Sequence, residues 1–302
     1  MTPNLKAHLA LFSVALIYGA NYTIAKDVMN DEYILPAPFV LMRAVFGAFV
    51  FWGIHRVWVK EKVAREDFPR LVLCGLFGVA INQLLFFEGL KLTTHINAAL
   101  IMTINPIAVL IASAILLKEP VSRQKILGIG LGIVGAIMLI MYGNKVAFDL
   151  AGSLGDLMIL INAISYGVYL VLVKPLMSKY HPITVVRWVF LFGSLMVIPF
   201  GFSAFEAINW SGFPTYIWAE VAYVLIFTTV LTYLLNAYAL QMVQPSVVSI
   251  YVYLQPLLAT FIALFLGKDV LTAWKVVAGI FIFTGVFFVS RKSGRIKISL
   301  KR

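Results

Sequence analysis

Long apolar stretches follow one another along this chain, and each is bounded by charged residues, prolines or turn residues. A transmembrane helix needs about 20 consecutive apolar residues, which is close to the length of every stretch. A membrane β-strand would alternate apolar and polar residues, whereas residues 123–142 are apolar on every face of a helix. The pattern therefore predicts an all-α polytopic membrane protein with ten transmembrane helices, at residues 8–26, 36–57, 70–90, 95–117, 123–142, 153–173, 182–202, 216–240, 245–266 and 272–290.

The composition supports a chain that lies almost entirely within a membrane. Apolar residues make up 62% of the 302 positions and charged residues only 12%, which excludes a soluble enzyme, a DNA-binding module and a disordered protein. We therefore interpret the net charge of +11 as a topology signal and expect no nucleic-acid partner. The single cysteine, Cys74, excludes an intramolecular disulfide, and the four histidines lie far apart in the sequence. No metal site and no cofactor are expected.

Lysine and arginine fall mostly on one side of the predicted membrane. If the N-terminus is cytoplasmic, 17 of the 24 basic residues lie on the cytoplasmic side, five lie on the opposite side, and Arg43 and Arg187 lie within helices. Positive residues accumulate on the cytoplasmic side, so both termini are predicted to face the cytoplasm. The first stretch has polar residues in its C-terminal half and lacks a clear small-residue cleavage site, which favours a retained helix over a signal peptide. The basic tail fits a topology role, with contact to anionic lipid as the alternative.

The chain resembles itself at an offset of about 150 residues. This predicts two five-helix repeats, 8–142 and 153–290, with a cytoplasmic N-terminus at 1–7, a linker loop at 143–152 and a basic cytoplasmic tail at 291–302. Because five is odd, the second repeat enters the membrane from the opposite side, and such inverted repeats are the basis of alternating access. The matching pairs include Pro106 and Pro256, Lys118 and Lys268, Gly135 and Gly285, and, at slightly smaller offsets, Tyr18 and Tyr166, Pro38 and Pro182, and Arg43 and Arg187.

Several stretches resemble the EamA-type permeases of the drug/metabolite transporter superfamily. They are IYGANYTIAK (17–26), LMRAVFGAF (41–49) and the long run from EGLKLTTHINAALIMTINPIAVL to LLKEPVSRQKILGIGLGIVGAIML (88–139). Residues 238–286 repeat the last run, but Gly267-Lys268-Asp269 replaces the usual Gly-Glu. The resemblance implies a ten-helix permease in which helices 1–4 and 6–9 enclose a central cavity and helices 5 and 10 are peripheral. It does not imply a particular substrate.

Residues 130–135 read Gly-Leu-Gly-Ile-Val-Gly, which matches the GxGxxG dinucleotide motif formally. No strand precedes the motif, and it lies in the middle of a membrane segment. Gly128 and Gly132 form a GxxxG pair, which allows a neighbouring helix to approach closely. We therefore expect helix packing here. The chain has no GxxxxGK[ST] motif, which disfavours ATP-driven pumping by this chain alone.

Uncharged polar residues near the middle of the membrane are the candidates for a substrate cavity. A polar group in hydrocarbon is costly unless it meets another helix or water. Interhelical hydrogen bonds or an interfacial aromatic belt are the alternatives for each residue. Asn162 and Tyr253 are further polar residues of the same helices that could line this cavity. The residues predicted to bind substrate are Tyr18, Asn21, Tyr22, Asn82, Gln83, Phe86, Asn105, Tyr166, Tyr169, Tyr233, Asn236, Tyr251 and Gln255.

Prolines and arginines at matching places in the two repeats are candidates for hinges or gates. Pro106 and Pro256 each follow an amide residue, and an interior proline removes a backbone hydrogen bond, so both predict kinks that flex or that remain static. Arg43 and Arg187 are close enough to helix ends to extend to the interface, which favours a packing or gating role over substrate binding. If they face the cavity, a carboxylate-bearing substrate is favoured. Proton coupling would need a carboxylate within the membrane. Helix 1 has none in this chain, and Glu88 is the nearest candidate for such a coupling residue.

Together these features predict a secondary transporter that moves a small polar metabolite, such as an amino acid or a derivative, across a bacterial inner membrane by alternating access. The resemblance implies export. A proton-coupled multidrug or cation exporter is the alternative, and it would need Glu88 or another buried carboxylate. A membrane-embedded enzyme and a non-transporting sensor are the alternatives from other classes; we predict no catalytic residues. The expected partners are a small-molecule substrate and membrane lipid, and a monomer is compatible with the sequence.

Overall fold

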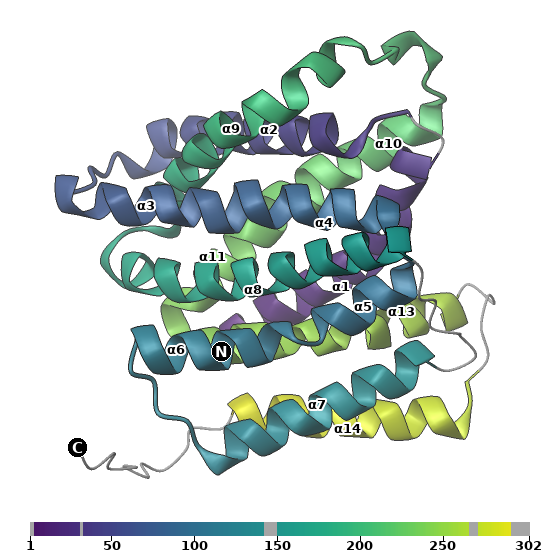
Figure 1. Ribbon diagram of the computed structural model, residues 1–302. Coiled ribbons are helices and arrows are strands. Elements are labelled where there is room, and N and C mark those ends of the chain that lie inside the picture. Colours follow the sequence, from purple (N-terminus) through teal and green to yellow (C-terminus); the bar gives the residue numbers. More distant parts are fainter. Residues whose placement is uncertain (1–2, 31–32, 142–149, 266–270, 291–302) are drawn as a thin grey trace.

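The computed structural model describes residues 3–30, 33–141, 150–265 and 271–290, which form helices joined by short turns and loops (Figure 1). No strand occurs within these ranges, so the predicted all-α class is confirmed for the described part of the chain. Most of the predicted linker 143–152, the tail 291–302 and the Gly267-Lys268-Asp269 motif lie outside the described residues.

Helices occupy the predicted segments wherever the chain is described. The first half contains α1 (Pro3–Asn30), α2 (Pro36–Ile54), α3 (Phe68–Gly75), α4 (Ile81–Leu92), α5 (His95–Met102), α6 (Asn105–Leu116) and α7 (Arg123–Met141). The second half contains α8 (Leu150–Lys179), α9 (Pro182–Glu206), α10 (Thr215–Tyr223), α11 (Thr232–Met242), α12 (Pro245–Ile250), α13 (Leu254–Phe265) and α14 (Ala273–Ser290). Wider π-helical turns join α3 to α4 at Leu76–Ala80 and α10 to α11 at Val224–Leu231.

Among the described residues, eight helical spans are long and apolar enough to cross a membrane, and Leu5–Asn21 within α1 is a shorter apolar helix. Many of the large hydrophobic side chains on their outer surfaces are exposed, including Phe49 (80%) and Ile115 (70%). In a soluble protein such a surface would be costly, whereas in a membrane it contacts lipid tails. The structure therefore supports a multi-pass membrane protein.

Two of the predicted helices are interrupted at matching places. A tight turn at Thr103 and Ile104 separates α5 from α6, and the 3-10 turn Tyr251–Tyr253 separates α12 from α13. Pro106 lies in the first turn of α6, where the proline ring needs no backbone N–H partner and does not clash with a preceding turn. The prolines therefore lie just after tight turns within the helical spans Asn97–Leu116 and Pro245–Ile262, at the places where the sequence predicted kinks.

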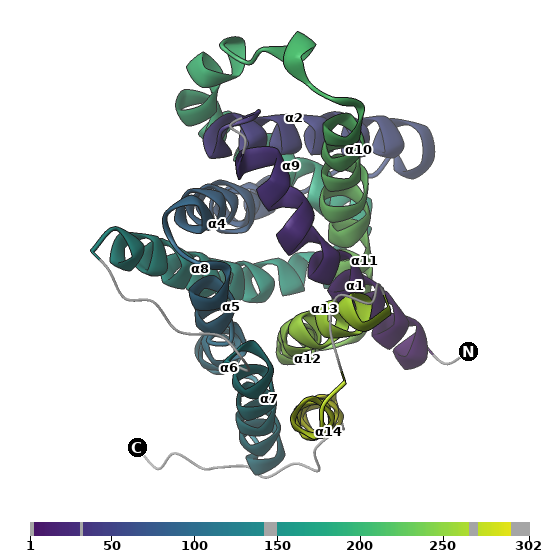
Figure 2. The same cartoon turned by 90° about the vertical axis from the view of Figure 1, so that its right-hand side faces the viewer.

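The closest helix pairs join one half of the chain to the other. They are α1 with α11, α4 with α8, α2 with α9, and α7 with α14 (Figures 1 and 2). The counterparts of α1 and α4 in the second half are α8 and α11, so exchanging the halves turns the pair α1–α11 into the pair α8–α4. The pairs α2–α9 and α7–α14 each consist of two counterparts and stay the same. This is the pairing that a two-fold relation between the halves produces.

The glycine-rich helix α7 packs against α14 at the edge of the bundle (Figure 2). A Cβ atom on Gly128 would lie 2.8 Å from the backbone oxygen of Gly285, and a Cβ on Gly285 would lie 2.6 Å from the backbone oxygen of Gly128. The two backbones are thus in direct contact, which only glycine permits. The prediction that Gly128 and Gly132 serve helix packing is confirmed, since Gly132 also lies against the ring of Tyr253.

Polar contacts join the halves at both ends of the long helix α8. Near its first residues, the Asp156 carboxylate accepts hydrogen bonds from Thr93 (2.5 Å) and Asn97 (3.3 Å). At its other end, Tyr180 donates to Asp67 (2.6 Å) and Lys179 pairs with the same carboxylate. About 23 helical residues, roughly 35 Å, separate the two sets of contacts.

Glu119 makes a further contact between the halves. It forms a buried ion pair with Lys125 and accepts a hydrogen bond from Ser246 (2.7 Å), in the first turn of α12. Glu119 thus fixes the loop before α7 to the second half of the chain.

Candidate functional site

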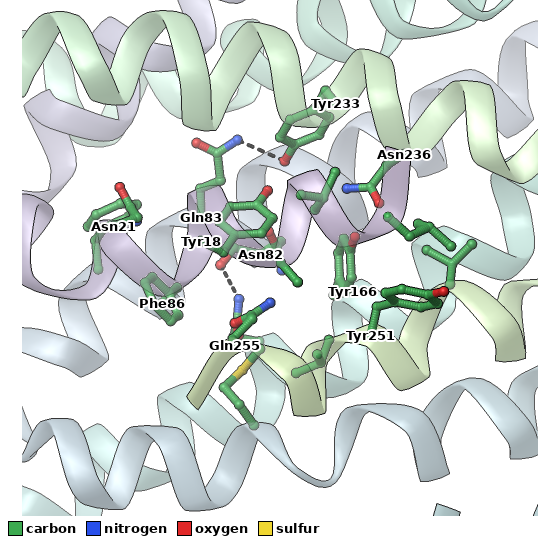
Figure 3. Close-up of a pocket in the computed structure, with 18 of the residues that line it drawn as sticks. Tyr18, Asn21, Asn82, Gln83, Phe86, Tyr166, Tyr233, Asn236, Tyr251 and Gln255 are labelled. Carbon is green, nitrogen blue, oxygen red and sulfur yellow. Dashed lines mark hydrogen bonds between the residues drawn. The ribbon is translucent and has the colours of Figure 1, made fainter. Parts of the chain in front are cut away.

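A cavity of about 100 Å³ lies between the two halves of the bundle. A buried water needs roughly 10–15 Å³ measured in the same way, so the cavity has room for several waters or for part of a small metabolite. Figure 3 shows Tyr233 and Asn236 on one side, Tyr251 and Gln255 on the other, and Tyr18 and Tyr166 between them. The complete lining is Leu11, Val14, Ala15, Tyr18, Asn21, Arg43, Asn82, Gln83, Phe86, Phe87, Met102, Asn162, Tyr166, Tyr233, Asn236, Val248, Tyr251, Val252 and Gln255.

Both halves contribute to this lining, through α1, α2, α4 and α5 on one side and α8, α11, α12, the following 3-10 turn and α13 on the other. Neither α7 nor α14 contributes any of these residues, in agreement with their expected peripheral place. Helix α9 was expected to enclose the cavity but also contributes none of them. Its Phe190 instead packs against Gly47 of α2 and lies 4.7 Å, between ring centroids, from the ring of Tyr233. The Phe190 ring therefore supports the cavity-lining Tyr233 without lining the cavity itself.

Most residues predicted to bind substrate line the cavity, and three do not belong to its described lining. Asn105 is fully buried and donates a hydrogen bond to the backbone oxygen of Ala163 (2.8 Å). Tyr169 is 4% exposed and its ring covers Gly78. The side chain of Tyr22 lies outside the described residues. The other predicted residues line the cavity: Tyr18, Asn21, Asn82, Gln83, Phe86, Tyr166, Tyr233, Asn236, Tyr251 and Gln255.

Gln83 and Tyr233 form a hydrogen-bonded pair across the cavity wall (Figure 3). The Gln83 Nε2 donates to the Tyr233 hydroxyl (3.1 Å), which in turn donates to the backbone oxygen of Gly78 (2.8 Å). Gln83 and Tyr233 are 150 residues apart, which is the offset of the internal repeat. Equivalent residues of two repeats touch only near a symmetry axis, so a contact of this kind is expected if the cavity lies close to a two-fold axis between the halves.

A second hydrogen bond joins residues at the same offset. The Tyr253 hydroxyl donates to the backbone oxygen of Thr103 (2.9 Å), at the break between α5 and α6. The interruption of a helix leaves carbonyl groups without their usual partners, and a buried carbonyl without a partner is costly. Tyr253 therefore satisfies the free oxygen of Thr103, and it couples the two interrupted segments.

Arg43 is the charged residue of the described lining. The side chain is 4% exposed, its Nε donates to the hydroxyl of Thr229 (3.0 Å), and its guanidinium carbon lies 4.9 Å from the centre of the Phe87 ring. Thr229 belongs to the π-helical turn before α11, and its hydroxyl donates to the backbone oxygen of Val224 (2.9 Å). The π-turn and α4 thus fix the guanidinium at the wall of the cavity.

Arg187 holds the matching place in α9 but lies away from the cavity. Its guanidinium donates to the His55 ring (2.7 Å) and is 4.6 Å from the centre of the Trp52 ring and 5.2 Å from that of Trp188. The backbone oxygen of Glu61 accepts a further bond from it (3.5 Å). These contacts show the packing arrangement at a helix end that we expected for this arginine.

Glu88 lies on α4 without reaching the cavity lining. It is partly buried beside the backbone of Ala37, in the first turn of α2. The N-terminal turn of a helix favours a negative charge, so this position gives the carboxylate a structural partner.

Sequence reasoning left several lining residues out of the predicted set. Asn162 was noted as polar, and its amide donates to the backbone oxygen of Asn82. The apolar members, such as Leu11, Val14 and Met102, have no feature in the sequence that separates them from lipid-facing residues. Thr229, which orients Arg43, gave no signal because its role depends on a contact between positions 186 residues apart.

The lining provides amide and hydroxyl groups, aromatic faces and one guanidinium. Within the described chain, no group of three or more His, Cys, Asp and Glu side chains comes together to hold a metal ion. The arrangement can bind and orient a small molecule through hydrogen bonds and ring contacts.

Residues 5–141 and 153–291 each match the model of the EamA-like transporter family. An uncharacterized transporter of Archaeoglobus fulgidus is 27% identical over 96% of this chain and 99% of its own, and the uncharacterized transporter YyaM of Bacillus subtilis is 25% identical over 95% and 94%. A probable terminal-alkyne amino-acid exporter of Streptantibioticus cattleyicolor is 25% identical over 44% of each chain.

A solved crystal structure covers 94% of this chain and 96% of its own with a TM-score of 0.72 at 17% identity, which shows the shared fold. The family matches span almost all of the described chain and include all the residues that line the cavity. The resemblance noted in the sequence is confirmed, and the chain is a multi-pass membrane protein that belongs to the EamA-like transporter family.

Proposed function

We propose that this chain is a secondary transporter that moves a small polar metabolite of amino-acid type out of the cell across the bacterial inner membrane. The observation that carries the proposal is a cavity lined by polar and aromatic side chains from both halves of the chain. A cavity at the interface of two repeats opens to one side or the other as the repeats tilt against each other. The partial similarity to a probable terminal-alkyne amino-acid exporter supports a substrate of this type.

The proposed topology has ten transmembrane helices in two inverted repeats, 8–142 and 153–290, with both termini in the cytoplasm. The distribution of 17 basic residues on one side and five on the other supports this orientation. The helix pairs, each of which joins the two halves, support the two-fold relation. The hydrogen bonds between residues 150 positions apart support it independently.

The interrupted segments are the proposed hinges of the alternating movement. The breaks at Thr103 and Tyr253 lie on opposite halves and are joined by one hydrogen bond, so a change at one is transmitted to the other. The helical segments after these turns carry Pro106 and Pro256 near their first residues, and they can tilt there without losing a backbone hydrogen bond from the proline, because proline has no N–H to donate. Of the two arginines, Arg187 joins α9 to the end of α2 as a packing contact, and Arg43 lies at the wall of the cavity.

The test is counterflow in proteoliposomes that contain the purified full chain. Labelled amino acids, nucleosides, sugars and organic cations are offered without an imposed proton gradient. We expect flux of one class, and we expect Tyr166→Ala to abolish it, because Tyr166 lines the cavity. Tyr216→Ala is the matched control, since this tyrosine is 53% exposed on the outer surface. Equal loss in both variants, or no flux of any class with or without a proton gradient, would contradict the proposal.

The proton-coupled exporter of cations receives less support. Its coupling residue would need to meet the substrate path, and the described lining contains no carboxylate. Cation flux that depends on a proton gradient and is lost in Glu88→Gln would reverse this preference.

A further inference from the structure

We propose that Arg43 is the residue that binds the substrate, through a carboxylate group, and that it selects monoanionic or zwitterionic molecules against cations. This inference rests on the proposed transport function and specifies its substrate class. It begins with an imbalance of charge. The cavity lining contains one arginine and, within the described chain, no Asp, Glu or Lys.

A guanidinium in this position is costly without a partner. Charged side chains within a membrane are normally paired with an opposite charge or with backbone carbonyls, or mark a substrate path. None of the ion pairs within the described chain includes Arg43. The titratable groups that interact with it are the neutral phenols of Tyr18 and Tyr233. An incoming carboxylate would supply the missing negative charge.

The geometry leaves the correct face of the guanidinium available. Its one hydrogen bond within the described chain is made by Nε, and the two terminal nitrogens have none. The bond to Thr229 and the ring of Phe87 hold the plane of the guanidinium in place. A planar, oriented fork of N–H donors matches a carboxylate in a bidentate arrangement, and lysine does not reproduce this match.

The single positive charge of Arg43 also limits the charge of the anion that the cavity can bind. One guanidinium neutralises a carboxylate, whereas a phosphate monoester would bring a surplus negative charge into a cavity without a second cation in its described lining. The rest of the wall consists of amides and aromatic rings such as Tyr18, Phe86 and Tyr166, which suit either a neutral remainder or the ammonium group of a zwitterion. A cation would meet the field of Arg43 without a compensating carboxylate.

The experiment compares charge classes on fixed scaffolds. Several aliphatic and aromatic scaffolds are each offered in counterflow as the amino acid, the carboxylate, the primary amide, the amine and the phosphate monoester. We expect flux with the two carboxylate-bearing forms. In Arg43→Gln that flux should fall about tenfold to a hundredfold, the equivalent of one charged hydrogen-bond partner. Arg43→Lys should retain an intermediate flux, because the charge remains and the fork is lost.

Arg187→Gln is the matched control, since it removes a second buried arginine that lies outside the cavity. It should retain carboxylate flux in the protein that remains folded. Thermal unfolding in detergent is measured for all variants. Arg43→Gln should be as stable as the wild type or more stable, because an unpaired charge is removed, whereas an arginine that served only packing would destabilise the protein when replaced.

The outcomes separate the two proposals. Flux of amines or amides that Arg43→Gln leaves intact would overturn the carboxylate assignment while the transporter stands. Flux of phosphate esters with the same dependence on Arg43 would overturn the substrate class. Carboxylate flux unchanged in Arg43→Gln, or a large loss of its thermal stability, would overturn the role of the residue. No flux for any compound would overturn the transport function itself.

Discussion

The second helices of the two halves, α2 and α9, carry an arginine at matching places and use it in opposite ways. Arg43 lies five residues after Pro38, and Arg187 lies five after the matching Pro182. The two arginines therefore hold the same place along their helices, and what differs is their surroundings. Arg187 reaches the helix end, where His55 and two tryptophans surround it. Arg43 reaches only Thr229, Phe87 and the cavity.

The comparison shows that α2 and α9 share the same fold but contribute differently to the cavity. In α9 the space near the cavity wall is filled by Phe190, whose ring contacts Gly47 of α2. In α2 the corresponding residue is Phe46, which does not line the cavity, and the guanidinium of Arg43 reaches the cavity instead. One copy therefore closes the wall and the other supplies the charge. A symmetric fold can in this way hold an asymmetric substrate.

The largest effect should come from breaking the contact between α2 and α9. A Cβ atom at Gly47 would lie 2.4 Å from the Phe190 ring, and that ring is enclosed by Phe51 and Tyr233. Gly47→Ala should therefore lower the free energy of unfolding by about 3 kcal/mol, an overpacking penalty. The measurement is thermal or SDS-induced unfolding of the purified protein.

Gly53→Ala on the same helix is the control, because nothing lies within 4 Å of its added Cβ. It should leave stability unchanged or raise it slightly, since alanine favours helix. Replacing Phe190 by leucine should rescue part of the Gly47→Ala loss. Equal stability of the two alanine variants would show that α2 and α9 are not packed as described.

A second prediction separates the surroundings of the two arginines. His55→Ala leaves the guanidinium of Arg187 without its strongest partner in a buried place and should cost about 2 kcal/mol of stability, with flux per folded protein unchanged. Thr229→Val removes the acceptor that orients Arg43 and should reduce carboxylate flux by about tenfold for a smaller loss of stability. Unfolding and counterflow on the same samples check both. The reverse assignment of effects would mean that Arg187 is the functional member of the pair.

The apolar stretches were sufficient to predict the helices. A segment within a membrane must satisfy its backbone groups internally, which requires a helix, and a helix that spans the membrane needs about 20 apolar residues. Polar residues near the middle of the membrane predicted most of the cavity lining, since side chains such as Gln83 and Asn236 are costly in contact with lipid tails. The same rule wrongly placed Asn105 in the cavity lining, whereas its amide donates a hydrogen bond to a backbone oxygen of α8. A sequence does not distinguish a polar group that faces a cavity from one that faces a helix.

The part that could not be predicted depends on contacts between distant positions. Arg43 and Arg187 look alike in sequence, and their separation required the positions of Thr229 and His55. The prolines at 106 and 256 predicted a disturbance of the helix in each half. Which group satisfies a carbonyl left free there depends on a distant contact, here the Tyr253 hydroxyl from the other half, which donates to the oxygen of Thr103.

A third prediction concerns the amides that precede these prolines. Asn105→Ala leaves the Ala163 oxygen without its side-chain donor in a fully buried place and should cost about 1.5 kcal/mol of stability. Gln255→Ala, at the matching place, removes a cavity-lining group and should instead lower flux with little change in stability. Unfolding and counterflow are measured on both variants. A loss of flux in Asn105→Ala at full stability would place that amide in the substrate path after all.

The smallest effects are expected where the halves meet in water, at the end of α8. Lys179 pairs with Glu66 and Asp67, but its side chain is 45% exposed, and water and salt screen such a pair. Lys179→Ala should therefore leave unfolding unchanged within error at physiological ionic strength. Tyr180→Phe should lower stability measurably, because the hydroxyl donates to Asp67 and accepts from the backbone of Ala64. If Lys179→Ala were the more damaging variant, and more so at low salt than at high salt, charge attraction rather than hydrogen bonding would hold the halves together here.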